Sequence, residues 1–184
     1  MARLSKQARR EQLLDVAAEL VRGKGADALT LVTLAETAGV SRPIVYDHFG
    51  TRAGLLLALY RELDERHRAA LTDALRTAEP TIDALADVMS TAYFACAIDM
   101  PEFTSLSAAL KGDPELEAMQ HELLAGYITL MADALAPHSS LPKDVLHLRC
   151  RGVLGAAEAI ATELIHDRTT AAEATAALAA IIRD

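Results

Sequence analysis

The stretch from Thr30 to Arg52, TLVTLAETAGVSRPIVYDHFGTR, limits the fold of this chain more than any other part of it. Thr30 is a good N-cap, and Leu31 and Leu34 begin an apolar repeat at helical spacing. Gly39 can adopt the positive φ angle that ends a helix and turns the chain. The sequence therefore predicts a short helix, a tight turn and a second short helix.

The second helix is expected to begin at Ser41, a favoured N-cap residue, with Pro43 in its first turn, where a missing amide proton costs little. Val45 and Phe49 are four residues apart and share one face, which we expect to be buried. Polar and small apolar side chains are left for the opposite face. This pattern is typical of a helix-turn-helix, whose second helix enters the major groove of DNA.

Arg42 is the predicted base-contacting residue, because a guanidinium can pair with O6 and N7 of guanine. Pro43 and Ile44 could touch thymine methyl groups. Asp47 could accept a hydrogen bond from cytosine N4 or point away from DNA. Arg52 is expected in the first turn of the next helix, where it and the helix N-terminus could share one phosphate.

The run from about Leu13 to Leu56 resembles the DNA-binding domain of the tetracycline-repressor (TetR) family. The matching positions are Ala17, Ala18, Leu20, Gly25, Thr30, Leu34, Ala35, Ala38, Gly39, Val40, Ser41, Tyr46, His48, Phe49, Arg52 and Leu55. The most specific part is Ala-Gly-Val-Ser followed by Tyr-x-His-Phe. The resemblance covers roughly the first third of the chain, and it implies that Thr30, Tyr46, His48 and Arg52 contact phosphates.

The predicted DNA-binding residues are Thr30, Thr33, Ser41, Arg42, Pro43, Ile44, Tyr46, His48 and Arg52. A satisfied capping or core histidine is the alternative for His48. Thr33 and Asp47 differ from the residues that the family often carries at these positions. Four cations near the start are Arg3, Lys6, Arg9 and Arg10. They either contact phosphates or the minor groove of DNA, or they form the solvated start of the first helix.

The composition favours an all-α fold, since hydrophobic residues make up 52% of the chain while Gly and Pro number only 9 and 6. Apolar stripes predict further helices near residues 51–78, 80–98, 102–111, 114–136, 142–167 and 170–183, giving about nine in all. Thr170 and Glu173 resemble a capping box. We expect a three-helix DNA-binding domain at residues 1–54 and a helical effector-binding and dimerisation domain at residues 55–184.

The net charge of −8 is unevenly distributed. Residues 1–54 carry eight Lys and Arg against six Asp and Glu, whereas residues 55–184 carry ten against twenty. A basic end on an acidic body is expected when only one end faces phosphates. No apolar run is long enough to predict a membrane span and no signal peptide is evident, so we expect a cytoplasmic protein.

Aromatic and methionine side chains gather in the middle of the sequence. The predicted ligand-binding residues are Met89, Tyr93, Phe94, Phe103, Tyr127 and Met131. They could line a cavity for an apolar or weakly polar small molecule, or they could form an ordinary helical core. The resemblance implies that these helices enclose an effector pocket. Lys111 is the only basic residue nearby, which disfavours a strongly anionic ligand.

The last two predicted helices combine apolar residues on more than one face with many small residues. The predicted dimer-interface residues are Leu148, Gly152, Gly155, Ala156, Ala159, Leu178, Ile181 and Ile182. Two such helices from each subunit could form a four-helix interface. The alternative is that they cover the core of their own subunit.

The sequence shows no phosphate-binding glycine loop, nucleophile elbow or metal-ligand spacing, so we expect neither an enzyme nor a cofactor or metal site. We expect a homodimeric regulator, most readily a repressor, that a small molecule releases from a palindromic DNA operator. The alternative is a helical small-molecule-binding or protein-interaction module without sequence-specific DNA binding. A helical enzyme is the third hypothesis.

Overall fold

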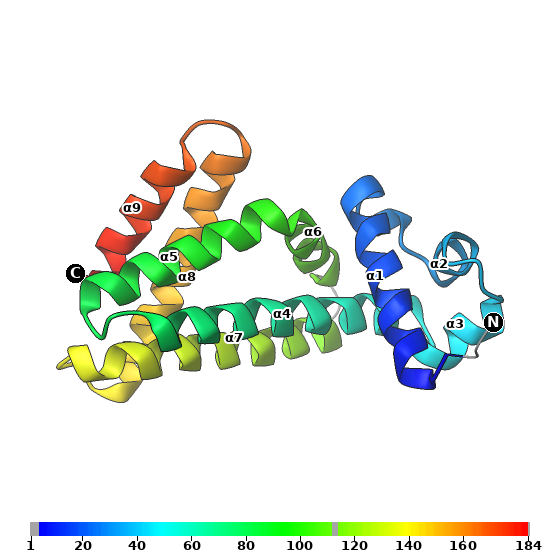
Figure 1. Cartoon of the computed structure of the whole chain (residues 1–184), viewed down its shortest axis with the longest axis horizontal. Coiled ribbons are helices and arrows are strands. Elements are labelled where there is room, and N and C mark those ends of the chain that lie inside the picture. The colour runs from blue at the N-terminus through cyan, green and yellow to red at the C-terminus, as the bar shows by residue number, and fades with distance from the viewer. Residues whose placement is uncertain (1–3, 112–113, 184) are drawn as a thin grey trace. The chain divides into compact units, whose positions relative to one another are not determined.

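The computed structural model describes residues 4–111 and 114–183 (Figure 1). Within these residues it contains nine α-helices, two short 3-10 helices and no strand, which confirms the predicted all-α class. The α-helices are α1 (Lys6–Lys24), α2 (Leu31–Thr37), α3 (Arg42–Phe49), α4 (Arg52–Thr77), α5 (Ile82–Asp99), α6 (Pro101–Leu110), α7 (Pro114–Leu135), α8 (Lys143–Ile165) and α9 (Ala171–Arg183). The 3-10 helices are η1 (Ala26–Ala28) and η2 (Ala136–His138).

The predicted helix boundaries are confirmed to within about two residues, because the local signals at their ends are strong. At the start of α9, for example, the Glu173 N–H donates to Thr170 Oγ1 over 3.2 Å, and the Thr170 N–H donates to Glu173 Oε2 over 2.9 Å. This reciprocal pair is the predicted capping box. None of the described helices combines the length and apolarity needed to span a membrane.

Packing divides the chain into two compact units. Unit 1 comprises Met1–Glu65 with Met100–His121, and unit 2 comprises Arg66–Asp99 with Glu122–Asp184. This grouping differs from the expected ranges 1–54 and 55–184, because the start of α4, α6 and the start of α7 belong with the N-terminal helices. Helices α4 and α7 each contribute residues to both units.

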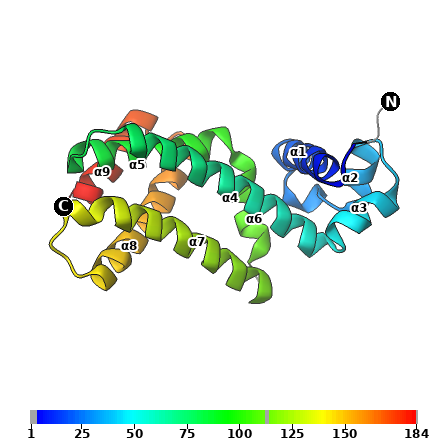
Figure 2. The same ribbon diagram turned by 60° about the horizontal axis from the view of Figure 1, so that its bottom comes forward.

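Unit 1 is built around α1, α2 and α3, which gather in Figure 2. Helix α6 packs against α1 and η1. Its Glu102 side chain is only 1% exposed and accepts two hydrogen bonds from the Arg22 guanidinium, at 2.7 Å and 3.1 Å. Ser105 Oγ accepts a hydrogen bond from the Ala26 N–H over 3.2 Å. These contacts fix a helix from the middle of the chain to the N-terminal helices of unit 1.

Phe103 also belongs to unit 1, where its ring stacks on Tyr60 with centroids 4.7 Å apart. The structure thus separates Phe103 from the other five predicted ligand-binding residues, which all lie in unit 2. The physical reason is the break at Met100, where α5 ends and Pro101 starts a new helix. Closeness in sequence does not place Phe103 in the core of unit 2.

Unit 2 has one hydrophobic core formed by α5, α7, α8, α9 and the end of α4. It contains Met89, Phe94, Tyr127 and Met131, with Tyr93 partly buried against it. The core also contains Leu178 and Ile182, which are 2% and 1% exposed. These two residues therefore pack in the core of their own subunit and do not form part of an exposed dimer surface, contrary to the expectation from the sequence.

His67 is an unusual member of the buried interior of unit 2. Its side chain is 8% exposed, and its ring stacks on Tyr127 with centroids 5.1 Å apart. Burial lowers the pKa of His67 below its ordinary value, because the charged imidazolium loses its hydration. The folded protein therefore holds this side chain in its neutral form at pH 7.

We predict that His67 makes the protein less stable in mild acid. Below the ordinary histidine pKa, His67 binds a proton in the unfolded chain but stays neutral in the folded protein. The free energy of unfolding therefore falls as the pH drops through about 6.5. Urea unfolding at pH 7.5 and 5.5 measures this loss, which should be smaller for His67→Gln than for the wild type. Exposed His138 offers a control, since His138→Gln should retain the wild-type loss. Equal losses in the wild type and His67→Gln would contradict the prediction.

Candidate nucleic-acid interface

The predicted helix-turn-helix is present. Helix α2 ends at Thr37, and Gly39 adopts a φ of +64°, as its position in the turn requires. The Val40 N–H donates to the Ala35 carbonyl over 3.0 Å and closes the turn. Helix α3 then starts at Arg42, with Ser41 at the N-cap position and a proline in its first turn.

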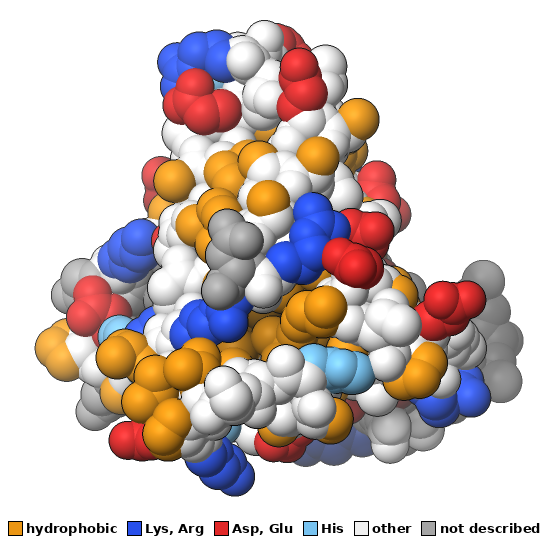
Figure 3. Space-filling model, turned by 90° about the vertical axis from the view of Figure 1, so that its left-hand side faces the viewer, with side chains coloured by type: hydrophobic (Ala, Val, Ile, Leu, Met, Phe, Trp, Pro, Cys, Tyr) orange, Lys and Arg blue, Asp and Glu red, His pale blue; other side chains and the backbone are white. Residues whose placement is uncertain are grey.

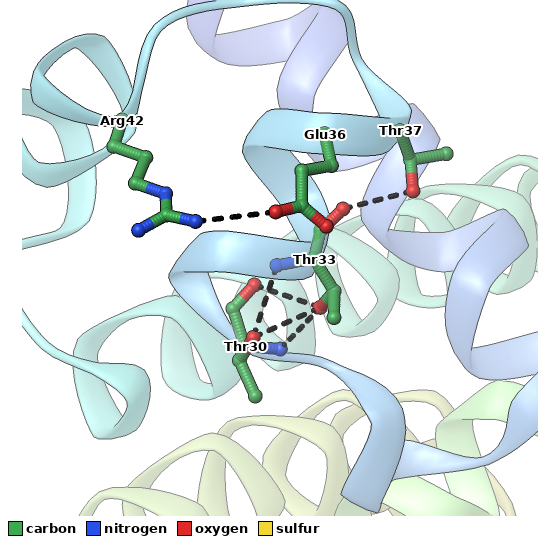
Figure 4. A network of polar contacts seen from close by, with 5 residues as sticks. All are labelled: Thr30, Thr33, Glu36, Thr37 and Arg42. Atoms are coloured by element: carbon green, nitrogen blue, oxygen red, sulfur yellow. Dashed lines mark hydrogen bonds and ion pairs between the residues drawn. The ribbon is translucent and has the colours of Figure 1, made fainter.

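A capping box fixes the start of α2 (Figure 4). Thr30 Oγ1 accepts from the Thr33 N–H over 3.0 Å, and Thr33 Oγ1 accepts from the Thr30 N–H over 2.9 Å. Thr33 Oγ1 also lies 2.8 Å from the carbonyl of Ala28, to which it donates. Both hydroxyls therefore stabilise the protein itself. The sequence signal was available, because Thr33 stands three residues after the N-cap, where a capping box needs a side-chain acceptor.

Helix α3 buries one face and exposes the other. Val45 is fully buried and Phe49 is 8% exposed, as their spacing predicts. The remaining side chains that we expect to face DNA are exposed, apart from the half-buried His48; they are Ser41, Arg42, Pro43, Ile44 and Tyr46. The Ser41 hydroxyl makes no capping hydrogen bond, so it remains available to a ligand. The exposed set offers a cation, two hydroxyls and apolar surface.

Ion pairs hold the charged side chains at both ends of α3. Arg42 Nη2 lies 3.3 Å from Glu36 Oε1 at the end of α2 (Figure 4). Asp47 Oδ2 lies 3.3 Å from Lys6 Nζ at the start of α1. Asp47 is therefore partnered within the protein, although its side chain stays exposed.

Arg10 attaches α1 to the end of α3. Its Nη1 donates to the His48 carbonyl over 3.0 Å, and its guanidinium lies 5.0 Å from the centre of the Phe49 ring. The pKa of His48 is lowered, first by burial and then by the nearby cations Lys6 and Arg10, while Asp47 opposes the shift. Of the other cations expected at the start, Arg9 bonds Gln12, and Arg3 lies outside the described residues.

Arg52 faces the turn between α1 and α2. Its Nε and Nη2 each donate over 2.9 Å, to the carbonyls of Leu29 and Ala26 respectively. Its Nη2 also lies 3.6 Å from Asp27 Oδ1. A single guanidinium thus ties the first helix turn of α4 to the segment that leads into the helix-turn-helix. Sequence reasoning missed this role, because the partners are backbone atoms more than twenty residues away.

Comparison with known proteins identifies this arrangement. Residues 13–59 match the family described as bacterial regulatory proteins, tetR family. The match covers the whole helix-turn-helix, the second half of α1 and the start of α4. This N-terminal part of the chain belongs to the DNA-binding domains of the TetR family.

Three known proteins illustrate this membership. The transcriptional activator FasR of Mycolicibacterium smegmatis is 36% identical over 75 residues, which cover 41% of this chain and 34% of FasR. The class D tetracycline repressor protein of Escherichia coli is 40% identical over 67 residues, covering 36% and 29%. A solved Rhodococcus structure assigned to the TetR family shares 20% identity over 95% of this chain and 97% of its own, with a TM-score of 0.79.

The sequence similarity to FasR and the tetracycline repressor thus spans about a third of each relative. The family match is likewise confined to residues 13–59, whereas the similarity of fold extends over nearly the whole chain. Among the described residues, no group of three His, Cys, Asp or Glu side chains could hold a metal ion. The two cysteines, half-buried Cys96 and buried Cys150, form no disulfide.

We predict that Arg52 acts on DNA binding through the stability of unit 1. Arg52→Ala removes two charge-assisted hydrogen bonds to carbonyls, which should cost about 1–3 kcal/mol and lower the melting temperature by several degrees. Arg52→Lys should lose much of the same stability, because a lysine cannot bridge both carbonyls with a planar fork. Thermal melts of the free protein measure both effects. An unchanged melting temperature with a weaker salt dependence of DNA binding would instead indicate a phosphate contact alone.

Proposed function

We propose that this TetR-family chain is a homodimeric regulator that binds a palindromic DNA operator and is released from it by a small molecule. The observation that carries the proposal is the outward face of α3. Arg42, Ile44 and Tyr46 are exposed there, while Val45 and Phe49 anchor the opposite face in the core. An exposed helix with a guanidinium, hydroxyls and apolar surface suits the edges of bases in the major groove.

Base contacts in this proposal come from the first turn of α3. Arg42 pairs with a guanine, and Pro43 and Ile44 pack against thymine methyl groups. Tyr46 and His48 lie further along the helix and donate to phosphates, which position the protein without selecting a sequence. The net positive charge of residues 1–54 favours this end over the acidic remainder in the approach to DNA.

The dimer surface that we propose is the exposed face of α8, with Ile181 of α9 beside it. Leu148 is 69% exposed and Ile181 is 41% exposed. Gly152 and Gly155 follow Leu148 on this face, and a Cβ atom added to either glycine would meet nothing within 4 Å. The remaining residues of the expected stripe are half-buried Ala156 and exposed Ala159. Figure 3 shows hydrophobic side chains along the α8–α9 hairpin below a charged tip.

Unit 2 supplies the proposed effector site. Its core combines methionine and aromatic side chains, which suit an apolar molecule. Two polar atoms buried in this unit, Ser90 Oγ and His147 Nε2, have no hydrogen-bond partner among the described residues. Buried polar atoms of this kind are costly when unpaired. A mainly apolar effector that carries a hydroxyl or carbonyl group could satisfy one of them.

Regulation then follows from a difference in affinity. An effector that binds unit 2 more tightly in one conformation shifts the population toward that conformation. A dimer holds two α3 helices at the spacing of successive major grooves, about 34–36 Å. A conformation with another spacing cannot engage both half-sites, so the effector lowers operator affinity. We therefore propose repression that the effector relieves.

The test of this function is a binding assay with the effector absent. We predict that the wild-type protein prefers DNA from upstream of its own gene to random DNA at moderate salt. Arg42→Ala should reduce that preference, at a cost of about 1–3 kcal/mol for the lost base contact, and leave binding to random DNA almost unchanged.

A wild-type protein that shows no preference would overturn the proposed regulator. It would favour the alternative of a helical ligand-binding or protein-interaction module. If binding of the protein to its operator increases transcription, the protein is an activator and not a repressor. The proposed DNA-binding role would then still hold.

The dimer surface yields a separate prediction. Gly155→Leu places a side chain in open space in the free subunit, so the fold should tolerate it. In a closely packed dimer the same side chain should prevent the approach of the two α8 helices and shift the protein to monomers. Sedimentation velocity measures the change. Gly23 is the control, since it lies on α1 with equally open surroundings, and Gly23→Leu should remain dimeric. A dimeric Gly155→Leu protein would place the interface elsewhere.

A further inference from the structure

Arg42, the proposed guanine contact, already has a partner in the free protein. Its Nη2 lies 3.3 Å from Glu36 Oε1, and the two side chains are 61% and 63% exposed. We propose that Glu36 is a specificity-determining positioning residue, which stays bound to Arg42 on DNA and orients its guanidinium toward the guanine. This inference rests on the proposed DNA-binding function and deepens it.

The geometry allows both interactions at once. Within the described residues, Glu36 is the one polar partner of the Arg42 guanidinium, and the contact is made through Nη2 alone. An arginine has five N–H donors, and Nη2 carries two of them. One Nη2 hydrogen can remain on Glu36 while the second, together with one on Nη1, forms the fork to O6 and N7 of guanine. Figure 4 shows the Glu36 carboxylate beside that end of the arginine.

Helix α2 gives Glu36 a fixed position. The capping box of Thr30 and Thr33 secures the first turn of α2, and the Thr37 hydroxyl donates to the Thr33 carbonyl over 2.8 Å in the last turn (Figure 4). Helix α2 also packs against α3. Glu36 is therefore presented from a supported element, which is what a positioning residue requires.

The advantage of the pair is preorganisation. A free arginine side chain loses much rotamer freedom when it contacts a base, and a partner that restricts it beforehand reduces that loss. An exposed ion pair is weak, worth up to about a five-fold change in an equilibrium. The expected contribution of Glu36 to base selection is therefore a few-fold.

A carboxylate close to DNA also repels phosphates, and the two effects must be separated. Repulsion weakens binding to every sequence alike, because all DNA carries the same backbone charge. Positioning strengthens binding only where Arg42 finds its guanine. We therefore compare two affinities, one for a site with the guanine and one for the same site with that guanine replaced. Repulsion changes both affinities by the same factor and leaves their ratio unchanged. Positioning changes only the first affinity and therefore changes the ratio.

The experiment begins by selecting an operator from random DNA with the wild-type protein. The guanine contacted by Arg42 is the position at which Arg42→Ala no longer discriminates. Affinities for the operator and for its guanine-replaced form are then measured for the wild type, Glu36→Ala and Glu36→Gln. Glu11→Gln is the matched control, because it removes an exposed carboxylate of α1 that is bonded to Gln7 instead of Arg42.

We predict that Glu36→Ala lowers the affinity ratio about three- to five-fold. Glu36→Gln retains an acceptor for Arg42 and should restore part of the ratio, while Glu11→Gln should leave it unchanged. At operator positions that Arg42→Ala still discriminates, Glu36→Ala should leave the corresponding ratio unchanged. Equal melting temperatures of the variants would show that a change in folding does not cause the difference.

Three results would overturn the inference. An unchanged ratio with tighter binding of Glu36→Ala to all DNA would make Glu36 a repulsive surface charge only. A loss of similar size at operator positions that Arg42→Ala still discriminates would mean that Glu36 acts through another residue. A wild-type protein that selects no DNA sequence would overturn the proposed function itself, and with it the positioning role of Glu36.

Discussion

The organisation of unit 1 depends on one buried carboxylate. The Glu102 side chain is almost completely removed from water, and a charge in that position needs a partner to offset its lost hydration. Arg22 provides two hydrogen bonds from the last turn of α1. Moving α6 away from α1 would break both of these hydrogen bonds. The compact unit therefore extends beyond the helix-turn-helix to a helix some eighty residues later in the chain.

Charged side chains of α3, the helix that we propose to face DNA, are also paired with residues of other helices. Arg42 and Asp47 stand at opposite ends of α3, and each is paired with a residue of another helix. Lys6 offsets the acid on α3, which would reduce its repulsion of phosphates on the helix that we propose to approach DNA. Arg10 binds the carbonyl of His48 and lies against the Phe49 ring, so α1 holds the end of α3 as well. Lys6, Arg10 and Glu36, all outside α3, thus contact both ends of this helix.

These contacts also show what sequence can and cannot predict. Thr30 and Gly39 act through their own backbone or that of the next few residues, so the helix starts and the turn were predictable from local pattern. Arg52 and Glu102 act on partners that are distant in sequence, and no spacing rule connects them. Phe103 shows the same limit. Its nearness in sequence to the other aromatic residues predicted that it would join them, but the helix break before Pro101 lets its ring stack on Tyr60.

Helix α8 shows why apolar pattern alone could not separate core from interface. It has apolar residues on more than one face, and a helix of that kind needs cover on each of them. Val153 and Ala157 are buried within the subunit, whereas Leu148 and Gly155 are exposed on another face. Buried and exposed residues alternate along two or three turns of the helix. Only the packing of the folded subunit shows which of them belong to the core and which to the open face. The subunit covers one apolar face and leaves the other open, and we propose that a second copy of the chain covers the open face in a twofold dimer.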